Sequence, residues 1–345
     1  MATNQNNTPP VATPEMLNAI RDEASQAYRE AVPVATLANL PDVGNPILRY
    51  QAIGNEFVEA LINKIVVQLI ERRMWRNPLS MLRRGEMPLG TDVEDIHVNP
   101  AEAVPYDGNE PGMEDILKMH KPDVASVYYR LNRRDKYRVT INNDQLRGAF
   151  TAWGKLESLI GAIVDSLYNG CTIDEFNYTK QLVSDAVAAN QIRVQNVALP
   201  VDEATGKAFM KVLRSTSVLF TFPSSDYNSY QQVGGATPRT SWVPIDEQII
   251  LIRGDVAAAV GVDVLAGLFN LNYGDYLTRQ IIVDSFGDDN TLAVLADEKA
   301  FVIMEQLREF RTFYNASSLG WQYYYHAWDL FAFSPFRNAI AFKSA

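Results

Sequence analysis

Histidine is the side chain best suited to acid–base catalysis near neutral pH, and the sequence contains three: His97, His120 and His326. None of them stands in an HExxH pattern or beside a cysteine, the arrangements that indicate a zinc site. His326 lies in an aromatic stretch that favours a β-strand, where a packed side chain is the simpler interpretation. The histidines therefore give no support to an acid–base or metal-dependent site.

Three other patterns resemble chemical sites only in part. Gly85–Thr91 is glycine-rich like a phosphate-binding loop, but it lacks the lysine and the strand-to-helix context that such a loop needs. The three aspartates between 284 and 289 do not follow the order of an EF-hand, so we expect a solvated turn. Cys171 has no His or Lys near it in sequence and is expected to be a small buried residue. We predict no enzyme, no catalytic residue, no metal site and no cofactor.

Composition narrows the class of protein further. The chain has 345 residues, of which 47% are apolar, enough for roughly two domains with well-buried cores. A net charge of −10 argues against binding of nucleic acid through one large basic face. A single cysteine excludes internal disulfides, and no run of about 18 apolar residues predicts a membrane span. The N-terminus has no pattern of a secretory signal.

Charged residues come in blocks of alternating sign. The first block is basic and contains Lys64, Arg72, Arg73, Arg76, Arg83 and Arg84 against Glu71 alone. The second is acidic, without Lys or Arg, and contains Glu86, Asp92, Glu94, Asp95, Glu102, Asp107, Glu110, Glu114 and Asp115. A third, basic block runs from Lys118 to Arg138. Because the acidic stretch is also rich in Pro and Gly, it predicts a long hairpin that docks on a complementary surface such as another copy of the chain.

Apolar periodicity predicts the elements that carry these charges. Spacings of three and four indicate a helix over 53–69, and another over 144–169 that ends at Gly170 and is followed by a second helix from Thr172. Gly154 and Gly161 are seven residues apart, on one stripe of the 144–169 helix, where another backbone could approach closely. The prolines in 31–46 favour an extended arm.

The second half of the sequence predicts a mixed α and β domain. Short apolar runs occur at 192–199, 218–222, 249–252, 281–283 and 292–295, with a helix-like stretch at 255–270. The chain then continues into an aromatic segment, 321–342, whose composition favours strands. The predicted fold class is α+β.

Four segments carry a resemblance to a known family. They are Asn77–Ile96, Gly148–Tyr178, Gly261–Leu277 and Trp321–Phe342, and they occur in the same order and at the same spacing as in that family. The sequence resembles the major head proteins of small short-tailed Bacillus-type phages (Picovirinae, Salasmaviridae). The resemblance implies the HK-97-like capsid fold and no catalytic role. The immunoglobulin-like domain of the best-known members has no counterpart here, and we expect no decoration role of that kind.

The resemblance also implies a domain organisation. It places an N-terminal arm at 1–50, a helix leading into the E-loop at 51–75, the E-loop at 76–117, a P-domain at 118–196 with a spine helix at 144–169, an A-domain at 197–296 and a return to the P-domain at 297–345. Within these regions the expected inter-subunit contacts are Arg72, Arg73, Arg76, Arg83, Arg84, Glu86, Asp92, Glu94, Asp95, Gly154 and Gly161.

The implied function is that of a major capsid protein. Copies of the chain would form pentamers and hexamers of an icosahedral or prolate shell around packaged double-stranded DNA, in the host bacterial cytoplasm. A scaffolding protein and a portal would be partners during assembly, the DNA would not be bound sequence-specifically, and no membrane would be involved. The alternative is a nucleic-acid-binding protein that uses the Arg and Trp75 cluster at 72–84, because aromatic stacking and phosphate contacts suit a single strand.

Overall fold

The computed structural model describes residues 14–68, 75–103, 119–142, 148–151, 153–235, 237–260, 280–315, 317 and 320–344. At 59, 61–68, 142, 153–164 and 203 it describes the backbone only. The chain divides into two compact units. The first contains the segments ending at 77, 134–175 and 307–327, and the second contains 78–133, 176–306 and the segment from 328 onward.

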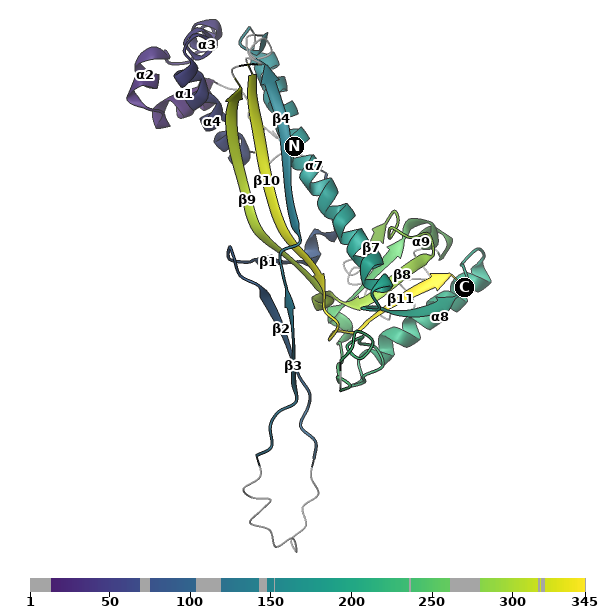
Figure 1. Ribbon diagram of the computed structural model, residues 1–345. Coiled ribbons are helices and arrows are strands. Elements are labelled where there is room, and N and C mark those ends of the chain that lie inside the picture. The colour runs from purple at the N-terminus through teal and green to yellow at the C-terminus, as the bar shows by residue number, and fades with distance from the viewer. Residues whose placement is uncertain are drawn as a thin grey trace, which may run out of the picture. The chain divides into compact units, whose positions relative to one another are not determined.

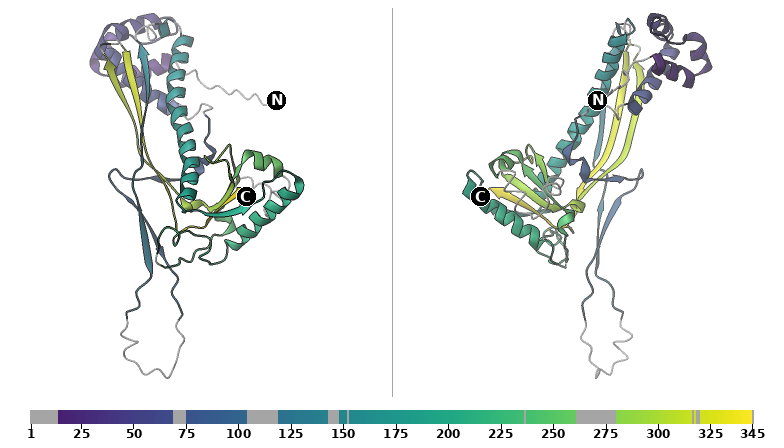
Figure 2. Two further views of the ribbon diagram at one scale, coloured as in Figure 1. Left: turned by 45° about the vertical axis from the view of Figure 1, so that its right-hand side comes forward. Right: turned by 180° about the vertical axis from the view of Figure 1, so that it is seen from behind.

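The first unit begins with four helices, α1 (Pro14–Glu23), α2 (Gln26–Ala31), α3 (Leu40–Arg49) and α4 (Gln51–Gln68). In Figures 1 and 2 these helices lie together beside the ends of three strands of the same unit. Their apolar faces share one core with the aromatic residues of those strands. The core includes Ile20, Tyr28, Val43, Ile47, Phe57, Phe150, Trp321 and Tyr323. The helix expected at 53–69 is therefore confirmed as α4.

The expectation of an extended arm over 31–46 is wrong, because α3 spans most of its second half. Pro41 lies in the first turn, where its missing N–H would have no helical partner anyway. Pro46 lies inside the helix and removes one backbone hydrogen bond. A stripe of buried side chains, Leu40, Val43 and Ile47, packs in the core and outweighs that loss.

A four-stranded sheet has the strand order β1 (Arg83–Glu86), β9 (Phe301–Asn315), β10 (Gly320–Phe333) and β4 (Arg133–Asn142). In the first unit, helix α7 (Trp153–Ala188) covers one face of this sheet. The contact is aromatic. The ring of Tyr168 on α7 lies 5.6 Å from that of Phe310 and 5.2 Å from that of Tyr325.

Helix α7 corrects the prediction of a spine helix at 144–169 with a separate helix after it. It is one helix of 36 residues that continues through Gly170. A glycine inside a helix costs about 1 kcal/mol, which packing can outweigh. Leu167 and Cys171 on either side are 2% and 5% exposed in the core, and the Tyr137 hydroxyl donates to Asp174 at 2.7 Å. The Tyr137 ring occupies the space beside Gly170.

The second unit is built on a five-stranded sheet with the order β5 (Arg193–Val197), β11 (Ala339–Ser344), β8 (Thr291–Asp297), β6 (Gln248–Arg253) and β7 (Gln280–Val283). Helices α8 (Glu203–Leu219) and α9 (Gly254–Val260) share a core with one face of the sheet, and the end of α7 shares a core with the other. Ile250 and Ile252 face the first core, whereas Ile249 and Leu251 face the second, as the alternation of a strand requires.

One expectation for this half of the chain is corrected. The apolar run at 218–222 is not a strand, because α8 begins at a capping box of Asp202 with Thr205 and continues to Leu219. The strand β11, at the end of the segment 297–345, is parallel to β5 and antiparallel to β8 in the five-stranded sheet. The expected strands at 192–199, 249–252, 281–283 and 292–295 correspond to β5, β6, β7 and β8.

None of the described helices is long and apolar enough to cross a membrane.

Candidate inter-subunit contact site

The hairpin of the second unit is a two-stranded antiparallel ladder, in which β2 (Val93–Val98) pairs with β3 (Val124–Tyr129). Because side chains alternate along a strand, the ladder has two faces. The inner face, which is buried or half-buried, consists of Val93, Asp95, His97, Ala125, Val127 and Tyr129. The outer face, which is exposed, consists of Glu94, Ile96, Val98, Val124, Ser126 and Tyr128.

The inner face attaches the hairpin to its own chain. Tyr129 is 9% exposed and packs with Met87, Val302 and Leu330. Burial, and secondarily the charge of Asp95, raises the pKa of the Tyr129 hydroxyl far above its ordinary value. An isolated pair of strands is marginally stable in water, so these contacts fix the ladder.

Two further groups of the inner face contact the turn between β10 and β11. The Ser334 hydroxyl donates to Asp95 at 2.5 Å, and the His97 ring stacks on Phe336 with 5.5 Å between centroids. The hairpin is therefore attached to the second unit through both a carboxylate and an aromatic ring on β2.

The outer face is apolar although it is exposed. Ile96, Val98, Val124 and Tyr128 are 50–62% exposed, and the Tyr128 hydroxyl donates to Glu94 at 2.7 Å. Contiguous exposed apolar side chains on a fixed element are typical of protein contact sites. Burial of each of them against another surface would contribute on the order of 1 kcal/mol.

The structure gives different surroundings to the predicted basic contact residues. Arg83 Nη1 lies 2.7 Å from Glu305 Oε2 of the same chain, so this charge has an internal partner. Arg84 donates to the backbone oxygen of Lys299. Arg76 is exposed at the start of the segment that leads into β1. The predicted contacts at 72 and 73 lie outside the described residues.

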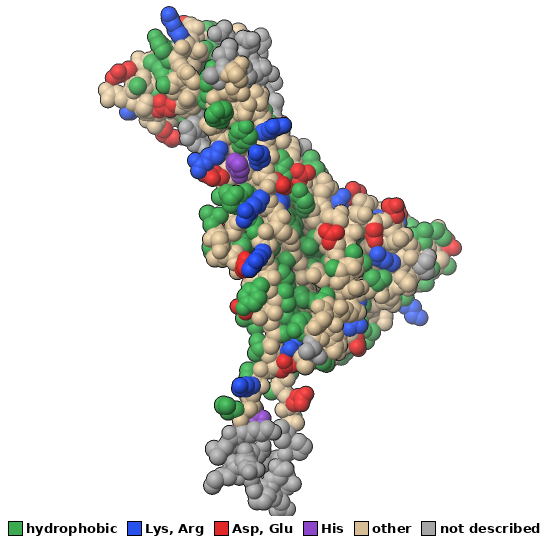
Figure 3. Space-filling model, in the orientation of Figure 1, with side chains coloured by type: hydrophobic (Ala, Val, Ile, Leu, Met, Phe, Trp, Pro, Cys, Tyr) green, Lys and Arg blue, Asp and Glu red, His purple; other side chains and the backbone are tan. Residues whose placement is uncertain are grey.

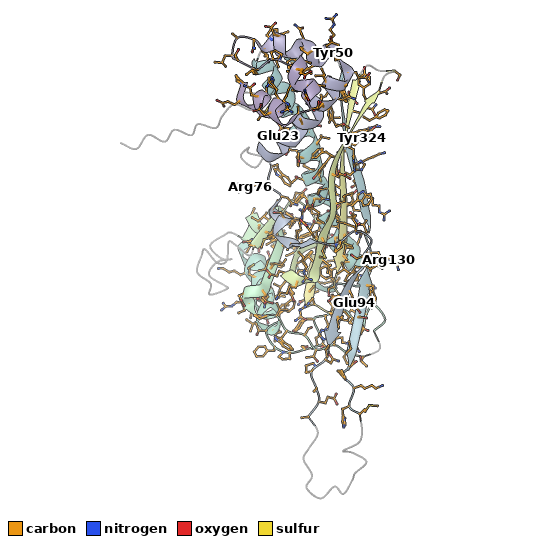
Figure 4. All side chains as sticks on the ribbon, turned by 90° about the vertical axis from the view of Figure 1, so that its left-hand side faces the viewer. Glu23, Tyr50, Arg76, Glu94, Arg130 and Tyr324 are labelled. Carbon is orange, nitrogen blue, oxygen red and sulfur yellow. The ribbon has the colours of Figure 1, made fainter. Side chains whose placement is uncertain are left out.

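The predicted acidic contact residues are largely occupied within the chain. Asp92 accepts from Arg130 Nε at 2.9 Å, and Glu94 and Asp95 accept from hydroxyls as described above. Figure 4 shows Glu94 and Arg130 on the hairpin. Glu86 is exposed on β1, where it is aligned with Glu305 of β9. Gly154 and Gly161 lie in the part of α7 for which the backbone alone is described.

One basic surface was not predicted from the sequence. The third charge block was described by its sign alone, without the two-residue alternation of a strand. On β4 the exposed basic side chains are Arg134, Lys136 and Arg138, and Thr140 is exposed as well, so alternation places all four on one face of the sheet. Lys136 Nζ lies 5.9 Å from the centre of the Tyr324 ring on the neighbouring strand β10. Figure 3 shows Lys and Arg side chains gathered over this sheet, and Figure 4 labels Tyr324. The two-residue spacing of Arg134, Lys136 and Arg138 was the sequence signal that could have identified this basic surface.

The described residues contain no group of three His, Cys, Asp or Glu side chains that could hold a metal ion. Two of the aspartates considered for a metal site form ion pairs with lysines instead. Asp284 lies 2.7 Å from Lys180 Nζ, and Asp288 lies 2.8 Å from Lys343 Nζ.

Solved phage capsids share this arrangement of elements. The capsid structure of Staphylococcus phage Andhra has a TM-score of 0.65 at 15% identity, over 80% of this chain and 86% of that one. The capsid structure of cyanophage P-SCSP1u has a TM-score of 0.53 at 9% identity, over 80% and 90% of the two chains. The fold is thus the HK-97-like fold of phage capsid subunits.

The family follows from sequence comparison. Residues 17–343 match the model of the Phi29-like phage major capsid protein, and the chain belongs to this family. The major capsid protein of Bacillus phage PZA is 32% identical over 96% of this chain and 72% of that protein. That of Streptococcus phage Cp-1 is 24% identical over 94% and 92% of the two chains. The family and the fold predicted from the sequence motifs are confirmed.

Proposed function

We propose that the chain forms pentamers and hexamers of a closed icosahedral or prolate head shell, which encloses packaged double-stranded DNA. Contacts between unlike surfaces, repeated around symmetry axes, close such a shell. Assembly would take place in the host bacterial cytoplasm with a scaffolding protein and a portal. The observation that carries the proposal is the apolar outer face of the hairpin, which is exposed in the single chain although its inner face is fixed.

In this proposal the outer face of the hairpin lies on a neighbouring copy. Supporting this, the acidic block of 86–115 contains no basic residue, and the row Arg134, Lys136 and Arg138 offers opposite charge on an exposed sheet face. Arg76, Arg84 and Glu86 remain predicted contacts. Arg83 is a weaker candidate, because Glu305 already neutralises it within the chain.

Substitution of Ile96 by Asp tests the proposed contact. Ile96 is 55% exposed, so the Ile96→Asp subunit should keep the wild-type unfolding temperature. It should form no closed shells under conditions where the wild-type protein does, as seen by negative-stain microscopy. Ile96→Val is the matched control and should form normal shells. Normal shells from Ile96→Asp would refute the contact.

The charge complementarity has its own test. Reversal of Lys136 and Arg138 to Glu should impair assembly without unfolding the subunit, and reversal of acidic residues in 86–115 should restore it. A double reversal that assembles no better than the single one would exclude this pairing. Subunits should not bind DNA, because their net charge is −10. Tight, salt-dependent DNA binding would favour the alternative function through 72–84.

A further inference from the structure

The outer end of the hairpin ladder is closed by a residue from each strand. Val98 and Val124 form the last pair of the ladder, and Asn99 and Asp123 come directly after it. The Asn99 amide N–H donates to the Asp123 backbone oxygen at 3.0 Å, and Asn99 Nδ2 donates to Asp123 Oδ2 at 2.8 Å. The two strands are thus tied to each other at the point where the charged excursion begins.

The segment 238–240, which lies between α8 and β6, binds this end of the ladder. Asn99 Nδ2 donates to the Pro238 oxygen at 2.9 Å, and the Thr240 amide donates to Asn99 Oδ1 at 3.1 Å. Arg239 bonds to Asp123 twice, with Nη1 to the backbone oxygen at 3.1 Å and Nη2 to Oδ1 at 2.9 Å. Asn99 and Asp123 therefore bind one short segment, 238–240, which lies about 140 positions away from Asn99 and about 115 from Asp123.

Aromatic rings connect Arg239 to the hairpin through a series of stacked contacts. The guanidinium carbon lies 5.2 Å from the centre of the Tyr230 ring, and the Tyr230 ring lies 4.9 Å from that of Phe336. Phe336 in turn stacks on His97 of β2. A continuous series of contacts thus runs from Asp123, directly before β3, through Arg239 and the two rings to His97 on β2.

The segment that presents Arg239 is itself restrained. Asn228 Nδ2 donates to the Arg239 backbone oxygen at 2.6 Å. A Cβ at Gly235 would lie 2.2 Å from the Tyr230 ring, so that the backbone turns tightly against this ring. The Arg239 side chain is 4% exposed, whereas that of Asp123 is 46% exposed. The Arg239 guanidinium is therefore fixed within the second unit, and the Asp123 carboxylate of the hairpin binds to it.

We propose that Arg239 is a positioning residue for assembly, which fixes the direction in which the hairpin leaves its own subunit. Contacts of Tyr129, Asp95 and His97 hold the inner face of the ladder, and Arg239 holds its outer end. An element held at both ends has one direction, whereas an element whose outer end is released can bend away from it. The proposal rests on the proposed function, because the direction of the hairpin matters only if it reaches a neighbouring copy.

Replacement of Arg239 by Met tests this role, because Met keeps the apolar stem and removes the donors. We expect a folded subunit in which the amides of β2 and β3 exchange hydrogen at least tenfold faster, measured by mass spectrometry. We also expect open or variable shells in place of shells of one size. Arg253→Met is the matched control. It breaks a similar pair with Asp255, 2.6 Å apart in the same unit, and should leave hairpin exchange and shell size unchanged.

A second variant covers the case in which the Arg239→Met subunit does not fold. Asp123→Asn with Asn99→Ala changes only the hairpin side and should also accelerate exchange in β2 and β3. Wild-type exchange in β2 and β3 of whichever of these variants fold would overturn the proposal. The exchange measurement uses free subunits, so it tests Arg239 even if the wild-type protein forms no shells. Failure of the wild-type protein to form shells would count against the proposed function instead.

Discussion

Arg133 Nη1 lies 2.8 Å from Asp329 Oδ2, and both side chains are 3% exposed. Arg133 begins β4 and Asp329 lies in β10, so the pair joins two neighbouring strands. The guanidinium carbon also lies 4.7 Å from the centre of the Tyr178 ring on α7. One cation thus connects the sheet to the helix that covers it.

Loss of this carboxylate should be costly. Asp329→Ala removes the ion pair of a buried cation and should lower the free energy of unfolding by about 3–5 kcal/mol in urea titrations of the subunit. The control is Asp92→Ala, since its partner Arg130 is 84% exposed, and that change should cost less than about 1 kcal/mol. Equal effects of the two substitutions would contradict the role of burial.

Gly170→Ala distinguishes one continuous helix from two. Inside a helix, Ala is favoured over Gly by about 1 kcal/mol, and the added Cβ would lie at an ordinary 3.4 Å from the Tyr137 ring. The substitution should therefore raise the unfolding temperature. If Gly170 ended a helix in the left-handed conformation, as the sequence suggested, the same change would lower it.

Gly44→Ala tests the packing of α3, where the sequence predicted an extended arm. A Cβ on Gly44 would lie 2.6 Å from the Phe150 ring, and such overpacking costs about 1–3 kcal/mol. Gly148→Ala is the control, because a Cβ there meets nothing within 4 Å. A neutral effect at both positions in thermal unfolding would mean that α3 does not pack on Phe150.

The attachment of the hairpin should weaken in acid. Burial first, and then the charges of Arg239 and Arg337, lower the pKa of His97 below its ordinary 6.5, against opposing effects of Asn99 and Asp95. The folded state therefore binds this proton less readily than the unfolded state. Stability from His97 is complete above pH 6.5 and is lost as the pH falls through the folded-state pKa.

Hydrogen exchange of β2 and β3 at several pH values measures this effect. Wild-type exchange, corrected for the intrinsic pH dependence, should accelerate below pH 6.5, and His97→Gln should show less acceleration. If exchange accelerated equally in both proteins, the effect would come from the protonation of carboxylates and not of His97. Asp123 is one such group, because its hydrogen bond from Asn99 and its contacts with Arg239 lower its pKa.

The sequence predicted what depends on local pattern. The aromatic run from Trp321 became β10, and the apolar repeat from Ile53 became α4. The charge blocks predicted a hairpin within the acidic stretch. Its first strand, β2, lies there, whereas its second strand, β3, lies in the basic block that follows. Family motifs predicted the fold class, because four of them in order specify one architecture.

Features that depend on tertiary packing could not be predicted from the sequence. Gly170 is a helix terminator by local chemistry, but the buried Leu167 and Cys171 on either side keep α7 continuous. Arg239 had no signal at all, since its partner Asp123 is 116 residues away. The predicted charged contacts were chosen by sign alone, and the structure shows that Arg83, Asp92 and Asp95 are used within the chain.

In the proposed shell, the outer face of the hairpin is buried against a neighbouring copy. Hydroxyl-radical footprinting of Tyr128 in free subunits and in purified shells tests it directly, because this side chain is 62% exposed in the single chain. Tyr323, which is 1% exposed, provides the baseline for a buried tyrosine. We predict that oxidation of Tyr128 falls towards that baseline on assembly. An unchanged oxidation rate in closed shells would contradict the account.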